Sequence, residues 1–251
     1  MRFKSLFGAA TAALLLGTLS SAHAQETVSL KLDLVSWGDD ITGLSLHSGG
    51  ANQALTAKSF TYSTPVRYSG PAIMQIHQQG GAKVDPKAPP NPAPIPPELA
   101  ALREKDPTIV AIAKLPSGSR RATVLIAPAQ SGTYQTFVID DDPSKLPLGK
   151  LRVHNYSPMN VAVRCNGKQG AAMKLKDSFL ADPKEGQIVY ELAYQQDGEW
   201  TVQENNLLSI TPQEQVQLIV LKSDADFFRS GDGSRTGFLQ TVTLRRTDTQ
   251  P

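Results

Sequence analysis

Short runs of alternating apolar and polar residues recur along most of this chain, and they constrain its fold more than any other feature of the sequence. In "VSLKLDL" (residues 28–34) every second residue is Val or Leu, so the apolar side chains would share one face of an extended strand. Comparable runs follow, each bounded by Gly, Pro, Ser or Asp: "SFTYSTPVRY", "AIMQIHQQ", "TIVAIAKL", "RRATVLIAP" and "TYQTFVID". No long stretch repeats at the helical period. The chain is therefore predicted to be all-β, with the strand-and-turn rhythm of a sandwich or barrel.

Residues 1–24 have the pattern of an export signal. A basic start is followed by an apolar stretch over residues 6–19 and by small residues that predict cleavage after Ala24. The apolar stretch is shorter than the roughly 20 residues that a membrane span needs, so a retained anchor is the weaker alternative. No cysteine follows to carry a lipid anchor. We expect the chain in the periplasm or outside the cell, with no membrane span after signal cleavage.

The charge balance gives no sign of a nucleic-acid partner. Arg2 and Lys4 leave with the signal, so 25 basic residues become 23, which equals the 23 acidic residues. A neutral chain without a basic stripe has no electrostatic footprint for nucleic acid or for an anionic membrane. Cys165 is the single cysteine, which excludes an intramolecular disulfide. Its alternation with Val161 and Val163 predicts a buried side chain rather than a reactive thiol.

One proline-rich segment, residues 83–108, interrupts the alternation. It holds eight prolines, which lack the N–H groups that a sheet needs and favour an extended polyproline conformation. Within it, "PELAALREK" predicts one short helix, with Pro at its start and basic residues near its end. The segment fits a long surface loop or spacer better than the alternative, a ligand for a proline-binding partner.

The sequence predicts two domains, residues 25–142 and 149–251, after the signal peptide. The linker between them, residues 143–148, contains two prolines, follows an acidic run and is followed by Gly149. Segments before and after it resemble each other in the same order: "SFTYSTPVRYSGPAIMQIHQQ" is matched by "SFLADPKEGQIVYELAYQQ", and "TYQTFVIDD" by "TGFLQTVTLRR". We therefore predict that the second domain repeats the first, although strands also resemble one another by composition alone.

Short motifs around this linker resemble a group of uncharacterised exported bacterial proteins, in which a strand ending in Asp-Asp and a Pro-Gly turn precede an Arg-x-x-Asn-x-Ser-Pro strand. The matching residues are Asp140, Asp141, Pro143, Pro147, Gly149, Arg152, Asn155, Ser157 and Pro158. The resemblance covers roughly residues 108–245, and implies two β-sandwich domains outside the cytoplasm and no activity. "LRVHNYSPMNVAVRCNGK" also looks like the opening of immunoglobulin-like domains. Together these imply two tandem immunoglobulin-like β-sandwich domains, the first with the proline-rich insertion and the helix.

The sequence contains no catalytic or metal-binding motif. His47, His77 and His154 fall on the polar sides of their strands, where solvated side chains are expected, and none has the spacing of a metal pair. There is no nucleophile elbow and no phosphate-binding glycine loop after a strand. We predict a protein that is not an enzyme and that carries no cofactor or metal. Two carboxylates assembled by folding would escape this reasoning.

Acidic clusters and two tryptophans supply the binding candidates. Trp37 precedes a Gly-Asp-Asp turn and could stack on a sugar ring, whereas Trp200 alternates with Val202 and is predicted to lie in the core. A third acidic cluster, in "SDADFFRSGDGSRTG", only superficially fits a calcium loop; Asp in such turns more often caps backbone N–H groups. The residues selected as candidates for binding are Trp37, Asp39, Asp40, Asp140 and Asp141.

The leading functional hypothesis is a non-catalytic protein of the cell envelope that binds or assembles with another protein. Sandwich edges can accept a strand from a partner, and the proline-rich loop offers a second surface. Two alternatives stay open. One is a carbohydrate- or cell-wall-binding module that uses Trp37 and the Asp-rich loops, with polysaccharide as its ligand. The other is a hydrolase with a fold-assembled acidic pair.

Overall fold

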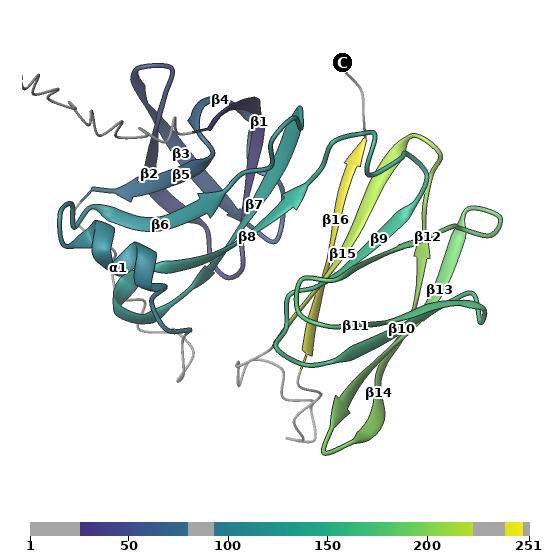
Figure 1. Cartoon of the computed structure of the whole chain (residues 1–251). Helices are drawn as coiled ribbons and strands as arrows, with labels where there is room; N and C mark the ends of the chain where they lie inside the picture. Colours follow the sequence, from purple (N-terminus) through teal and green to yellow (C-terminus); the bar gives the residue numbers. More distant parts are fainter. Residues whose placement is uncertain (1–25, 80–92, 223–238, 248–251) are drawn as a thin grey trace, which may run out of the picture.

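The computed structural model describes residues 26–79, 93–222 and 239–247, and within them the chain is almost entirely β (Figure 1). The all-β prediction is confirmed. The export signal, the start of the proline-rich segment and the acidic "SDADFFRSGDGSRTG" segment lie outside the described residues. The predicted helix is present as α1 (Pro97–Arg103), which begins with Pro at its first turn and buries Leu99.

The strands form two groups of eight that pair only within their own group in the described part of the chain. The first group, called the N-terminal half, contains β1 (Thr27–Ser36), β2 (Ile41–Ser48), β3 (Ala51–Ser59), β4 (Val66–Pro71), β5 (Ile73–Gln78), β6 (Ile109–Lys114), β7 (Arg121–Pro128) and β8 (Tyr134–Asp140). The second, called the C-terminal half, contains β9 (Leu151–Asn155), β10 (Val161–Cys165), β11 (Gln169–Met173), β12 (Ser178–Ala181), β13 (Gln187–Gln196), β14 (Glu199–Ser209), β15 (Glu214–Lys222) and β16 (Leu239–Thr247).

The two halves share one pairing scheme. In the C-terminal half, β12-β9-β15-β16 forms one sheet and β11-β10-β13-β14 forms a second. The N-terminal half has the same neighbours in the orders β4-β1-β7-β8 and β3-β2-β5-β6. In each half the first and seventh strands pair in parallel, while these other neighbours are antiparallel. This strand-for-strand agreement supports the predicted duplication.

The N-terminal half differs from the expected two-sheet sandwich in one respect. A short parallel contact between Val35 and Lys58 and between Ser36 and Ser59 joins its two sets of strands into one eight-stranded sheet. The two end strands of that sheet, β6 and β8, also lie close together. The Thr136 hydroxyl on β8 donates a hydrogen bond to the carbonyl of Ile112 on β6 at 2.6 Å. The sheet therefore curls around its core, whereas the C-terminal half keeps two separate sheets.

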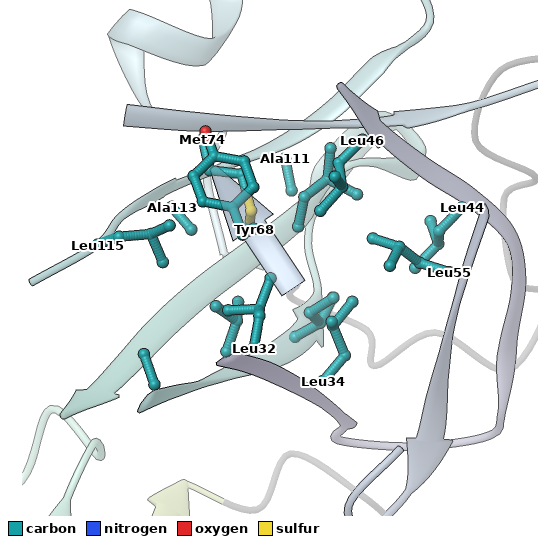
Figure 2. Close-up of a cluster of buried hydrophobic side chains, with 14 of the residues drawn as sticks. Leu32, Leu34, Leu44, Leu46, Leu55, Tyr68, Met74, Ala111, Ala113 and Leu115 are labelled. Carbon is teal, nitrogen blue, oxygen red and sulfur yellow. The ribbon is translucent and has the colours of Figure 1, made fainter. Parts of the chain in front are cut away.

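Each half encloses its own apolar core, made by the inward-facing residues of its alternating strands. Figure 2 shows the N-terminal core, where Leu32 and Leu34 of β1 face Leu44, Leu55 and other large side chains. The C-terminal core contains Val161, Val163 and Cys165, so Cys165 is buried as predicted, and burial raises the pKa of its thiol to about 11. A thiol in this environment stays protonated at neutral pH and packs as a small apolar group.

Candidate functional site

The two halves meet through the outward faces of β1, β7 and β8 on one side and of β9, β15 and β16 on the other. Phe137 of the N-terminal half stacks on Tyr156 of the C-terminal half, with 4.7 Å between ring centroids. Both belong to a third buried cluster, here called the junction. It consists of Val35, Leu125, Phe137, Ile139, Tyr156, Ile219, Leu221 and Leu244, with Trp37, Tyr62, Ala127 and Val242 packed against it. An apolar surface of this kind fixes the halves against each other.

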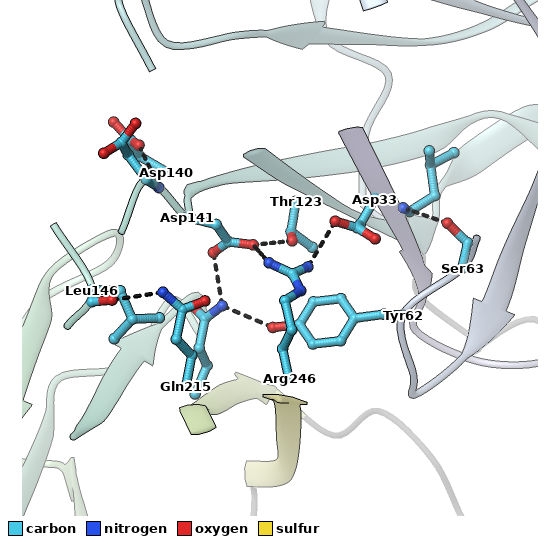
Figure 3. Close-up of polar contacts among 12 residues, drawn as sticks. Asp33, Tyr62, Ser63, Thr123, Asp140, Asp141, Leu146, Gln215 and Arg246 are labelled. Carbon is cyan, nitrogen blue, oxygen red and sulfur yellow. Dashed lines mark hydrogen bonds and ion pairs between the residues drawn. The ribbon is translucent and has the colours of Figure 1, made fainter. Parts of the chain in front are cut away.

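A polar network crosses the junction and centres on Arg246 of β16 (Figure 3). Its Nη2 donates to Asp33 Oδ2 at 2.7 Å, and its Nη1 donates to Asp141 Oδ2 at 3.2 Å. Its guanidinium carbon lies 4.0 Å from the centroid of the Tyr62 ring. Asp33 and Asp141 are 2% and 0% exposed, so both carboxylates depend on protein groups for their hydrogen bonds.

Side chains from both halves complete the shell around Asp141. It accepts hydrogen bonds from the Thr123 hydroxyl and from Gln217 Nε2, the latter at 2.7 Å. Gln217 Nε2 also lies 2.9 Å from Tyr62 Oη, while Gln217 Oε1 accepts from His154 Nε2 at 2.9 Å. Asp141 is thus held by β7, β15 and β16 together, which leaves its carboxylate no open side for a ligand.

Burial governs the electrostatics of the network. Desolvation raises the pKa of Asp33, although the nearby charge of Arg246 works against that rise. Desolvation alone would lower the pKa of Arg246, but Tyr62, Asp141 and Asp33 outweigh it and the pKa is raised. Burial lowers the pKa of His154 to about 3, so this side chain is neutral at pH 7. The network therefore places one guanidinium between two carboxylates, with a neutral imidazole beside them.

The acidic run before the linker forms a tight turn. Asp140 accepts hydrogen bonds from Ser119 Oγ at 2.8 Å and from Lys145 Nζ. Asp142 accepts from the backbone N–H groups of Arg120 at 2.9 Å and of Ser144 at 3.0 Å, and these bonds hold the pKa of its carboxyl well below the usual range. Asp140 and Asp142 thus act as turn-capping side chains.

The other binding candidates lie at the end of β1. Trp37 is half-buried, packs edge-on against Phe60 at 5.5 Å and borders the junction. Asp40 accepts from Lys58 Nζ at 2.8 Å and from the Ser59 N–H at 2.7 Å, and the Lys58 contact lowers its pKa. Asp39 is exposed. Trp37 therefore borders the junction and Asp141 belongs to the polar network that crosses it, while Asp39 and Asp40 lie on a turn outside the network.

A second surface stands out on the outward face of β13 and β14. Val189 lies directly opposite Leu207 across these strands, and Trp200 and Val202 lie further along β14 on the same face. All four are large apolar side chains with exposed fractions from 47% to 57%. β14 is also the last strand of its sheet, so one long side of it has no strand neighbour among the described residues.

Two predictions about single residues are wrong. The alternating pattern predicts Trp200 in the core, but it is 47% exposed, because its position on β14 faces outward with Val202. The same pattern predicts a solvated His154, but it is 5% exposed, because the outward face of β9 is covered by the other half. The sequence reasoning also missed Asp33, Arg246 and Gln217, which look like ordinary polar positions of alternating strands. Only the predicted duplication indicated a second face able to cover them.

No group of three or more His, Cys, Asp or Glu side chains within residues 26–79, 93–222 and 239–247 is arranged to hold a metal ion. In the same ranges, no helix has the length and apolar character of a membrane span. The chain matches no protein-family model and no curated protein.

Proposed function

We propose that this is a non-catalytic, exported protein of the cell envelope, which binds an extended segment of a partner protein along β14. In this proposal it consists of two tandem immunoglobulin-like domains, residues 25–142 and 149–251, joined by residues 143–148. The apolar row on the exposed edge strand β14 is the observation that carries the binding proposal. A partner strand would add backbone hydrogen bonds to the edge, while alternate side chains would pack on Trp200 and Val202.

A comparison with the other edges of the C-terminal half supports this choice. β11 and β12 have five and four residues, and β16 carries the partly exposed Arg245. Short edges and charged side chains are the usual protection against strand addition. β14 has eleven residues and contains no Lys, Arg or Pro. Its two charged residues are Glu199, at its first position, and Glu204, which is bonded to Thr241 of β16. Gln203 and Glu204 hold its middle against β16, so residues 199–202 form the longest continuously exposed run of the strand.

The alternatives receive less support from the same geometry. Asp33 and Asp141 form a close acidic pair, as the hydrolase hypothesis requires, but both are buried and bonded to Arg246. A substrate could not reach them without separating the halves. For sugar binding, Trp37 borders the junction and has only part of its ring exposed. Trp200 is the more accessible ring, and it shares its face of β14 with the exposed Val202, an apolar row that suits a peptide better than a polar sugar.

In-cell photo-crosslinking from β14 tests the proposal. A photoreactive residue is placed at position 200 or at position 202 in the tagged chain, and crosslinked peptides are identified by mass spectrometry. Strand addition predicts one partner whose crosslinked residues shift by two when the probe moves by two, since side chains alternate along a strand. Val202→Lys should abolish the crosslink from position 200. Ile73→Lys, an exposed apolar position on β5, is the matched control and should leave it unchanged.

Two results would refute the strand-addition proposal. One is a crosslinked partner position that does not shift by two residues when the probe moves from 200 to 202, or a crosslink from position 200 that persists in Val202→Lys. The other is retention of the chain on polysaccharide or cell wall that is lost in Trp37→Ala but not in Val202→Lys, which would favour the carbohydrate-binding alternative. Circular dichroism of each variant checks that the fold is retained, which is expected for Val202→Lys and Ile73→Lys because both positions are exposed. The check is most important for Trp37→Ala, because Trp37 is half-buried beside the junction.

A further inference from the structure

The shared pairing scheme allows each residue of the junction to be matched with a counterpart in the other half. The parallel ladder of β1 and β7 ends at Ser36 and Ile126, and the ladder of β9 and β15 ends at Asn155 and Val220. The next backbone N–H in each half makes the same bond: Trp37 N donates to Ile126 O, and Tyr156 N donates to Val220 O, both at 2.8 Å. This common bond fixes the alignment of the two halves: Trp37 corresponds to Tyr156, and Ile126 corresponds to Val220.

Counting back from that bond aligns the outward faces row by row. The rows run across the first, seventh and eighth strand of each half, as fixed by the ladders. The matched outward residues are Asp33, Thr123 and Ile139 with Arg152, Gln217 and Leu244; Val35, Leu125 and Phe137 with His154, Ile219 and Val242; and Ala127 with Leu221, Trp37 with Tyr156, and Asp141 with Arg246.

The junction is built from these matched positions. Leu125 and Ile219, Ile139 and Leu244, and the remaining apolar pairs all belong to the junction or pack against it. His154, the counterpart of Val35, stacks on Tyr156 at 5.7 Å between ring centroids. The same patch on both halves therefore forms the contact, which is the property of an interface between two copies related by a twofold axis.

The cross-contacts follow the same exchange. β1 contacts β16 through Asp33 and Arg246. The counterpart of β1 is β9, and the counterpart of β16 is β8. These two strands also meet, because Tyr156, which follows β9, stacks on Phe137 of β8. Asp141 and Arg246 are counterparts of each other and are in direct contact at 3.2 Å. Two matched residues can touch only near the axis that relates the halves, so this pair marks the position of that axis.

At two of the matched positions the charges have opposite signs. The rest of the row of Asp141 and Arg246 is not inverted, since Lys31 corresponds to Lys150 and Arg121 to Gln215. Asp33 corresponds to Arg152, and Asp141 corresponds to Arg246. The exchange thus converts the observed Asp33–Arg246 pair into a pair between Arg152 and Asp141. Burial lowers the pKa of Arg152, and the negative charges of Asp141 and Asp140 oppose that lowering, so Arg152 lies within electrostatic reach of Asp141 although it makes no ion pair with the described residues. Two identical N-terminal faces would instead bring carboxylates together at the axis, and two C-terminal faces would bring guanidinium groups together.

We propose that the junction is a quasi-twofold recognition interface in which each half binds the other as a subunit-like partner, and that the inverted charges at positions 33, 141, 152 and 246 specify docking of unlike halves. The occupant of each face is therefore the other half of the chain. This inference is independent of strand addition at β14, which concerns the opposite sheet of the C-terminal half.

Charge exchange in the full chain tests the proposal, with opening of the junction as the readout. Opening is followed by the radius of gyration from X-ray scattering and by the rate of proteolytic cleavage within residues 143–148. Arg246→Asp and Arg152→Asp should each open the junction and raise cleavage roughly tenfold, since either change places like charges together. Arg164→Asp, on the outward face of the other sheet, is the matched control and should change neither quantity.

The decisive comparison is between three and four exchanged charges. Asp33→Arg, Asp141→Arg and Arg246→Asp together place a new guanidinium at position 141 beside the native Arg152, so the junction should stay open. Adding Arg152→Asp completes the exchange of these four charges, and cleavage should return to within about twofold of the unmodified chain.

Two outcomes would overturn the proposal. The first is a fourfold exchange that is no better closed or folded than the threefold one, as judged by circular dichroism and scattering. The second is an Arg152→Asp chain that is as closed as the unmodified protein. Either would mean that the Arg246 contacts are a local ion-pair network with no counterpart across the junction.

Discussion

The His154 imidazole is buried at the junction and donates to Gln217 Oε1, and burial lowers its pKa to about 3. An unfolded chain has a histidine pKa near 6.5. Below that pH the unfolded state binds a proton that the folded state does not, so the free energy of unfolding falls as the pH falls from 6.5 towards 3. Linkage gives a loss of about 2 kcal/mol between pH 7.5 and pH 5 from this residue.

His154→Gln keeps a donor at the same position and removes the titration. Urea unfolding at pH 7.5 and pH 5 should therefore show a drop in the free energy of unfolding about 2 kcal/mol smaller in the variant than in the parent chain. His47→Gln, at an exposed position bonded to Asn52, serves as the control for the same substitution outside the junction. Equal pH dependence in the parent and in His154→Gln would show that His154 is accessible to protons in the folded state.

The burial of His154 also explains where sequence reasoning stops at the residue scale. Alternation correctly places Arg152 and His154 on the face of β9 that points away from its own core. For a single sandwich that face would be wet. Here the N-terminal half covers it. The covering strands are β1, which lies more than 100 residues before β9 in the sequence, and β7 and β8, which lie on the other side of the linker. Period-two patterning carries no information about that second layer.

Among the elements, β11 has a close backbone contact that only glycine allows. A Cβ atom on Gly170 would lie 2.9 Å from the carbonyl oxygen of Val163 on the paired strand β10. Because the obstacle is backbone, the strands would have to separate, and we expect Gly170→Ala to cost about 1–3 kcal/mol of unfolding free energy.

Chemical denaturation of Gly170→Ala beside Ala172→Ser gives the measurement. Ala172 is exposed two residues along the same strand, so its substitution should change the free energy of unfolding by less than about 0.5 kcal/mol. A Gly170→Ala chain as stable as the control would show that β10 and β11 can adjust at no cost.

At this scale the sequence predicts much of the fold. The alternating runs around β1, β5, β6, β7 and β8 are strands, and the Pro-initiated segment is the helix α1. Trp200 shows the limit of the same pattern. Its alternation with Val202 correctly indicates one shared face of β14, but alternation does not say which face is inside. The polar partners Gln203 and Glu204 reach back to β16, so the apolar side is the one exposed.

In the whole molecule, two separate cores are coupled through the junction. Adjacent residues of β15 separate these roles: Leu218 points into the C-terminal core, and Ile219 points into the junction. Both side chains are fully buried, and the two residues are adjacent in the same strand. A charged side chain that stays buried at either position costs several kcal/mol of unfolding free energy. At position 219 the charge can reach water if the two halves separate, whereas at position 218 it stays inside the C-terminal core.

Calorimetry should therefore resolve two unfolding transitions for Ile219→Glu and one for the parent chain, because in the variant each core melts without the other. Its radius of gyration should rise while its circular dichroism keeps the β-sheet signal. Leu218→Glu should instead abolish the C-terminal transition and reduce that signal, because its charge lies within a core that has no way to open. A single transition in Ile219→Glu at the parent temperature would mean that the junction contributes nothing to stability, and that the two halves are joined by the linker alone.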